Sequence, residues 1–112
     1  MKTINRTALT IIPQQPFVDW ANGIDEDGPK WDETSIRATS ILIPDDYDEF
    51  NYEEFLKKHY KEIFELELGS WMTDPDVWPK KRSYSMFMNW FLVVPSDMVI
   101  EMGKGQIRME DY

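Results

Sequence analysis

The feature that most constrains the fold is an apolar stripe between residues 52 and 64. Its side chains recur at intervals of three and four, which places them on one face of an α-helix of about three and a half turns. Asn51 with Glu54 predicts a capping pair at its start, and Gly69 predicts its stop. Such a helix needs an apolar layer to cover. The stripe consists of Tyr52, Phe55, Leu56, His59, Tyr60, Ile63 and Phe64.

Three segments carry the residue pattern of β-strands. Residues 4–12 and 34–43 are rich in β-branched side chains, and each stops at a proline. Residues 92–102 alternate instead, and Pro95 within them indicates an edge strand or a bulge. The alternating side chains are Leu92, Val94, Met98, Ile100 and Met102. These segments predict the layer that the long helix covers.

Shorter helices are predicted beside the long one. Residues 16–22 have apolar side chains at helical spacing, between a proline and a glycine that suit a helix start and stop. Residues 83–91 combine strand-type residues with helical spacing, and Ser83 as a ready N-cap favours the helix. Asp74, followed by a proline, predicts one further turn that runs to Trp78.

The predicted element order is β-α-β-α-(α)-α-β. A length of 112 residues fits a single domain over residues 1–112, with residues 103–112 as a loose tail. With 42% hydrophobic and 14% aromatic residues, the chain can bury a core. A small sheet is stable only when something packs on it. We therefore expect an α+β fold in which helices cover a three-stranded, mixed or antiparallel sheet, with the strand order and the oligomeric state left open.

The negative charge is concentrated in one segment. Of the net charge of −9, residues 19–54 account for twelve acids and only Lys30 and Arg37 as bases. Direct nucleic-acid binding is therefore not expected, because contacts to phosphate dominate that affinity. A basic partner protein suits the segment better. The absence of cysteine excludes disulfides and thiolate metal sites, and no apolar run is long enough to cross a membrane. We expect a cytoplasmic protein with no membrane contact.

Neither a metal site nor a cofactor motif is predicted. If Gly28 were the sixth residue of a calcium loop, Gly23 and Thr34 would hold positions one and twelve, where carboxylates are needed. His59 is the only histidine, and nothing around it has the spacing of a zinc site. Its place on the apolar stripe favours a core or boundary role. An enzyme would have to use His59 with a carboxylate, and the paired acids in so acidic a chain are expected by chance.

The tryptophan-centred motifs are the sharpest local signal. Large aromatics of this kind can wedge helices onto a sheet, while Asp74 caps a turn and Arg82 pairs with an acid. Alternatively, Trp and Arg anchor a recognition surface. Trp31 lies off any periodic face and is predicted as an exposed anchor. The candidate binding residues are Asp19, Asn22, Trp31, Trp71, Asp74, Trp78 and Arg82.

These motifs resemble those of a family of small uncharacterised bacterial proteins. The resemblance rests on PFVDWAN at residues 16–22, on WMTD followed by WPKKR at residues 71–82, and on the later FMNWF and DMVIEM. It covers most of the chain apart from residues 23–33 and the tail. It implies a compact single domain with a helix over residues 83–91, and it implies no activity.

The sequence thus predicts a binding domain without catalysis of its own, and the partner is expected to be another protein. In the first version the Trp/Arg surface engages that partner. In the second version the acidic segment neutralises a basic target, as immunity proteins and nucleic-acid mimics do. The enzyme that uses His59 is the third alternative.

Overall fold

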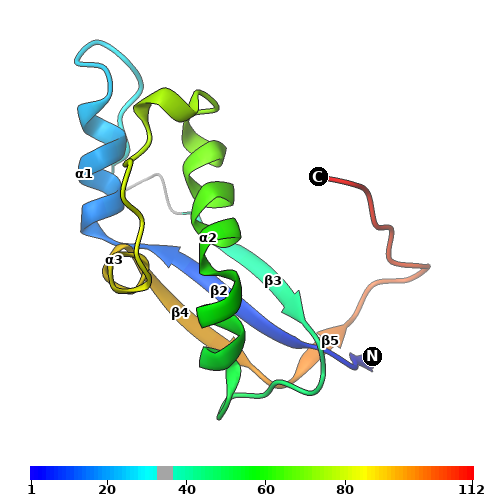
Figure 1. Ribbon diagram of the computed structural model, residues 1–112. Coiled ribbons are helices and arrows are strands. Elements are labelled where there is room, and N and C mark those ends of the chain that lie inside the picture. The colour runs from blue at the N-terminus through cyan, green and yellow to red at the C-terminus, as the bar shows by residue number, and fades with distance from the viewer. Residues whose placement is uncertain (33–36) are drawn as a thin grey trace.

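The centre of the fold is a three-stranded antiparallel sheet (Figure 1), seen in a computed structural model that describes residues 1–32 and 37–112. Strand β2 (Thr7–Pro13) lies between β3 (Thr39–Ile43) and β4 (Phe91–Ser96). In its register Ile11 lies opposite Thr39 on one side and Val93 on the other. The predicted α+β class is therefore confirmed, with an antiparallel sheet whose first predicted strand is central.

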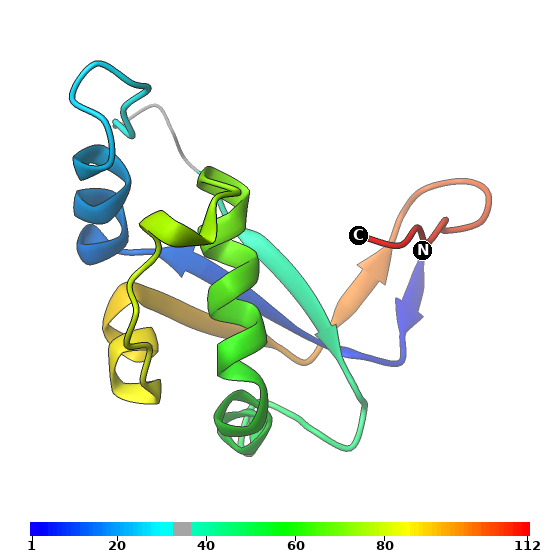
Figure 2. The ribbon, with the colours of Figure 1, turned by 45° about the horizontal axis from the view of Figure 1, so that its top comes forward.

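Three α-helices lie on the same side of this sheet (Figures 1 and 2): α1 (Gln15–Gly23), α2 (Tyr52–Trp71) and α3 (Tyr84–Trp90). A short 3₁₀ helix, η1 (Pro75–Val77), joins α2 to α3. Between the helices and the sheet lies a single apolar core, rich in phenylalanine because large rings fill the space efficiently. Its buried members are Leu9, Ile11, Phe17, Ala21, Ile43, Leu56, Ile63, Phe64, Leu68, Phe87, Phe91 and Val93.

A separate two-stranded ribbon extends from one end of the sheet (Figure 2). Strands β1 (Lys2–Ile4) and β5 (Val99–Glu101) pair antiparallel, with Thr3 opposite Ile100. Ile4 pairs with Val99 in the ribbon, and Ala8 pairs with Ser96 in the main sheet. The three residues 5–7 on one side of the ladder therefore lie opposite the two residues 97–98 on the other. One extra residue on one side of a ladder is a β-bulge, which bends the strands and interrupts their pairing.

Several predicted strand bounds change in the structure. Residues 92–102 form two strands instead of one, and residues 4–12 divide in the same way at the bulge. The strand predicted over residues 34–43 begins at Thr39; residues 34–36 of it, with residue 33 of the preceding loop, lie outside the described residues. Residues 103–112, predicted as a loose tail, form no helix or strand and are exposed.

Two predicted helix signals at the ends of α2 are wrong. Asn51 makes no side-chain cap to the helix; its Oδ1 instead accepts from the backbone N–H of Asp48 at 2.7 Å. Gly69 does not end the helix, which continues to Trp71. A Cβ at Gly69 would lie 3.5 Å from the ring of Trp78, so the glycine gives close access to this indole within the helix. The helices predicted after Ser83 and Asp74 are both present, with these side chains as caps.

Candidate functional site

Indole N–H groups join the ends of the helices. Trp20 on α1, Trp71 at the end of α2 and Trp78 after η1 each donate to a backbone carbonyl of another segment or turn. The respective acceptors are the oxygens of Val77 at 3.0 Å, Ala21 at 3.3 Å and Met72 at 2.8 Å. All three side chains are half-buried. Their polar atoms are therefore used within the molecule, where they hold α1, α2 and η1 together.

Asn22 and Trp31 are brought together by two hydrogen bonds. The amide Oδ1 of Asn22 accepts from the Trp31 backbone N–H at 2.6 Å, and its Nδ2 donates to the Trp31 carbonyl at 3.1 Å. The Trp31 ring lies 5.4 Å from that of Trp71 and 5.5 Å from that of Phe17. Trp31, which the sequence predicted as an exposed anchor, is half-buried and packs against the core.

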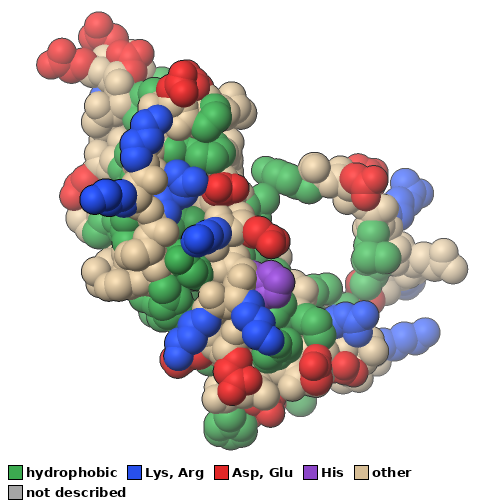
Figure 3. All heavy atoms as spheres, in the orientation of Figure 1, with side chains coloured by type: hydrophobic (Ala, Val, Ile, Leu, Met, Phe, Trp, Pro, Cys, Tyr) green, Lys and Arg blue, Asp and Glu red, His purple; other side chains and the backbone are tan. Residues whose placement is uncertain are grey.

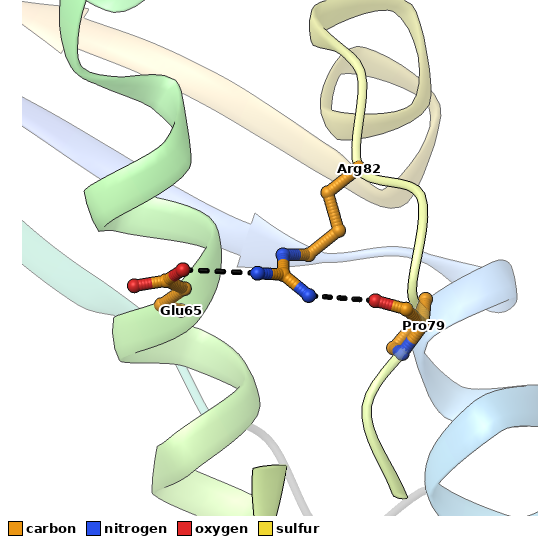
Figure 4. Close-up of polar contacts among 3 residues, drawn as sticks. All are labelled: Glu65, Pro79 and Arg82. Atoms are coloured by element: carbon orange, nitrogen blue, oxygen red, sulfur yellow. Dashed lines mark hydrogen bonds and ion pairs between the residues drawn. The ribbon is translucent and has the colours of Figure 1, made fainter. Parts of the chain in front are cut away.

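Arg82 spans the gap between α2 and the segment after η1 (Figure 4). Its Nη2 lies 2.9 Å from Oε1 of Glu65, and its Nη1 donates to the carbonyl of Pro79 at 2.7 Å. The guanidinium carbon also lies 5.9 Å from the centre of the Trp78 ring, within the range of a cation–π contact. Both terminal nitrogens of the Arg82 guanidinium thus donate to groups of its own chain.

The two remaining candidates are aspartates with local partners. Asp74 accepts from the Asp76 backbone N–H at 2.9 Å and caps η1. Asp19 is exposed on α1 and accepts from the side chain of Gln15 at 2.7 Å. The seven predicted residues therefore do not converge on one groove. Asn22 groups with Trp31 and Trp71, Arg82 groups with Trp78, and the two aspartates each have a local partner of their own.

His59 lies at the surface between α2 and β3. Its side chain is 40% exposed, its ring centre lies 4.4 Å from that of Phe55, and its Nδ1 lies 3.7 Å from Oε1 of Glu62. The adjoining hollow of about 280 Å³ has apolar walls. Its lining residues are Ile41, Phe55, His59, Glu62, Ile63 and Leu66. Among these described residues there is no hydroxyl or amine to act as a nucleophile, so the imidazole faces a mainly apolar hollow.

The acids between β3 and α2 gather near the β-bulge. Asp45 and Asp48 border a hollow of about 290 Å³ together with Asp97 and Arg6. The side chain of Asp48 stabilises its own turn, since its Oδ1 accepts from the backbone N–H groups of Phe50 at 2.8 Å and Asn51 at 3.1 Å. Within residues 1–32 and 37–112, no group of three His, Cys, Asp or Glu side chains is arranged to hold a metal ion.

The sheet face opposite the helices is an apolar surface that sequence reasoning missed. Side chains alternate between the two faces of a sheet, and directly paired residues share a face. The register therefore assigns eight strand residues to this open face, and none of them is charged. They are Ala8, Thr10, Ile12, Ser40, Leu42, Leu92, Val94 and Ser96.

The most exposed members of the open face are aliphatic. Leu42 is 52% exposed, Leu92 50% and Val94 39%. Leu92 and Val94, whose alternation predicted the last strand, thus lie on the open face, while Phe91 and Val93 point into the core. In the described part of the chain no helix covers this face (Figures 1 and 2). A solvated antiparallel sheet face is normally polar, so the exposed leucines and valine make this face unusually apolar.

Glu67 is a second feature that the sequence reading missed. It continues the apolar stripe of α2 toward the helix end and is only 4% exposed. Burial raises the pKa of its carboxyl, against the opposing effects of a hydrogen bond with Thr39 and the charge of Arg37. Among the described residues nothing donates to its Oε1. Its spacing of three and four residues from Phe64 and Ile63 was the available signal.

Comparison of the chain with protein-family models, with curated proteins and with solved structures gives no match. The resemblance to the family with tryptophan-centred motifs therefore stays a prediction. Among the described residues no helix has both the length and the apolar character needed to cross a membrane.

Proposed function

We propose that this chain is a non-catalytic binding domain that docks a protein chain onto the open face of its three-stranded sheet. The observation that carries the proposal is the exposure of Leu42, Leu92 and Val94 on a face without a single charged strand residue. Burying such side chains in a partner removes apolar area from water, which is the main favourable term in protein association.

The proposed contact surface is the open face of the sheet and does not include the tryptophans. Trp71, Trp78 and Arg82 already make hydrogen bonds within the chain, so the donors in use can bind a partner only if these internal bonds break. Removing the aliphatic side chains of the open face from water breaks no such bond. Binding also suits the molecule better than catalysis, because the hollow beside His59 offers the imidazole the exposed carboxylate of Glu62 but no hydroxyl or amine nucleophile.

The absence of cysteine supplies a direct test. Val94 and Val77 are the same residue type with nearly equal exposure, 39% and 38%, but only Val94 lies on the open face. A Val94→Cys variant and a matched Val77→Cys control are produced at native level in the source cells and labelled there with a permeant maleimide. We expect slower labelling of the Val94→Cys thiol in cells than in dilute purified protein, and equal labelling of the control in both. Equal rates for the Val94→Cys thiol in both settings, with a purified chain that stays monomeric at every concentration, refute the proposal.

A second candidate function is supported by the acids around the β-bulge. Asp45, Asp46 and Asp48 are exposed there, next to Asp97, and could meet a basic protein. The two candidates differ in their response to salt. A contact with the acids weakens steeply as ionic strength rises, whereas an apolar contact with the open face persists. Capture of a partner at low and at high salt separates them.

A further inference from the structure

We propose that the occupant of the open face is a second copy of this chain, packed sheet against sheet. This inference rests on the proposed function, because it names the partner of the same surface. In such a dimer the same patch is used twice, and a residue that contacts another across the axis is contacted by it in return. Antiparallel sheets that pack face to face lie about 10 Å apart, with their strands rotated by about 30°.

The distribution of charge favours a second copy over a charged partner. The chain has a net charge of −9, yet the eight strand residues of the open face carry none of it. The helix side seen in Figure 3 displays both acids and bases. A basic partner would find no carboxylate among the strand residues of the open face, so nothing there would pair with its lysines or arginines. An equally uncharged apolar face matches it without leaving any charge buried and unpaired, and the chain itself presents one.

The outline of the face also fits self-association. Large and small side chains lie next to each other across the strands of this face: Leu42 lies beside Ala8 and Val94 beside Thr10, while Leu92 lies beside Ile12. Two such faces can place the large side chains of one copy beside the small side chains of the other. Interdigitation of this kind is how paired sheets fill the space between them.

The size of the face sets the expected strength. Three strands about 4.8 Å apart, each with about six residues of about 3.4 Å, offer about 300 Å² of sheet. A standard stable interface takes about 800 Å² from each partner. We therefore expect a reversible dimer, with a Kd between about 10 µM and about 1 mM.

Salt gives this dimer a distinctive signature. Two copies each carry a net charge of −9, so they repel one another at low ionic strength. Screening weakens this repulsion, and the apolar contact itself needs no charge. Self-association through the open face therefore strengthens as salt is raised from about 0.05 M to about 0.5 M. Binding of a basic protein to the acids changes in the opposite direction.

Sedimentation equilibrium of the purified full chain tests the inference. We expect the average mass to rise from 13.4 kDa toward twice that value between about 10 µM and about 1 mM, and to rise further in higher salt. Val94→Lys should hold the mass at that of the monomer, while the matched Val77→Lys control should associate as the wild type does. Circular dichroism checks the folding of each variant. If Val94→Lys does not fold, Leu42→Lys tests the same face from the other edge strand.

Each remaining outcome is decisive. A wild-type mass of 13.4 kDa at every concentration and salt overturns the second-copy inference. The inference also fails if Val94→Lys and Leu42→Lys both associate as the wild type does. If the purified chain is monomeric but the Val94→Cys thiol is protected in cells, the proposed function stands and its partner is a different protein. If the thiol is unprotected in cells and the purified chain also stays at 13.4 kDa, the proposed function itself fails.

Discussion

Replacing Trp78 by alanine separates a structural tryptophan from a recognition anchor. The half-buried ring represents about half of the 1.5–3 kcal/mol that full burial of a large apolar side chain provides. Its bond to the Met72 carbonyl adds about 1 kcal/mol, and the cation–π contact with Arg82 about 0.5 kcal/mol. The expected loss is therefore about 2–3 kcal/mol, against a total stability of about 5–15 kcal/mol for a domain.

The assay is urea unfolding followed by far-ultraviolet circular dichroism. With a slope of about 1.5 kcal/mol per molar urea, the midpoint for Trp78→Ala should fall by about 1.3–2 M, and the variant should stay folded in buffer. Trp78→Phe keeps a ring but loses the donor, and should lose about 1 kcal/mol. Val77→Ala, next to it in sequence and exposed, should stay within about 0.5 kcal/mol of the wild type. If Trp78→Ala is as stable as the wild type with an unchanged slope, the ring does not stabilise the fold. The hypothesis that Trp78 and Arg82 form a recognition surface would then be favoured.

Three further predictions concern single contacts. Glu67→Gln should be more stable than the wild type at pH 7. Burial raises the pKa of the Glu67 carboxyl in the folded state, so the stability of the wild type falls as pH rises from the pKa of the unfolded chain through that of the folded protein. The advantage of the variant should therefore vanish near pH 4 in matched urea titrations. A constant difference across this range would contradict the assignment. Ser83→Ala should lower the free energy of unfolding by about 1 kcal/mol, because it removes the N-cap of α3. Ser83→Asp can still cap the helix and should keep most of this stability, so equal losses in the two variants would exclude capping as the cause. Asn22→Ala should lose about 1–3 kcal/mol in the same assay, since both backbone groups of Trp31 lose their partner; a loss below about 0.5 kcal/mol would show that the pair is dispensable.

The elements that sequence predicted well are those with a strong internal period. The stripe from Tyr52 to Phe64 could form a helix and little else, and all of its buried members face the core. Ser83 and Asp74 were predictable as caps because capping depends on the local chain alone. The α+β class followed from these helices together with the β-branched segments.

The open face could not be predicted because alternation does not say which set of side chains is covered. In β4, Phe91 and Val93 are apolar, and so are Leu92 and Val94. Only the placement of the helices decides between the two sets, and that is a property of the whole fold. The same holds for Trp31, whose packing depends on a chain segment that returns to Asn22, and for the indole bonds to distant carbonyls.

The order of the strands also determines when the sheet can form during synthesis. The central strand β2 is made early, while its partner β4 begins at Phe91, roughly 80 residues later. At about 5–20 residues per second, a ribosome needs about 4–16 s to reach β4. During that interval Leu9 and Ile11 have no completed core and one edge of β2 stays unpaired. The sheet can therefore close only after β4 has been made, and until then the nascent chain offers the unpaired edge of β2 and its apolar side chains to chaperones or to other chains.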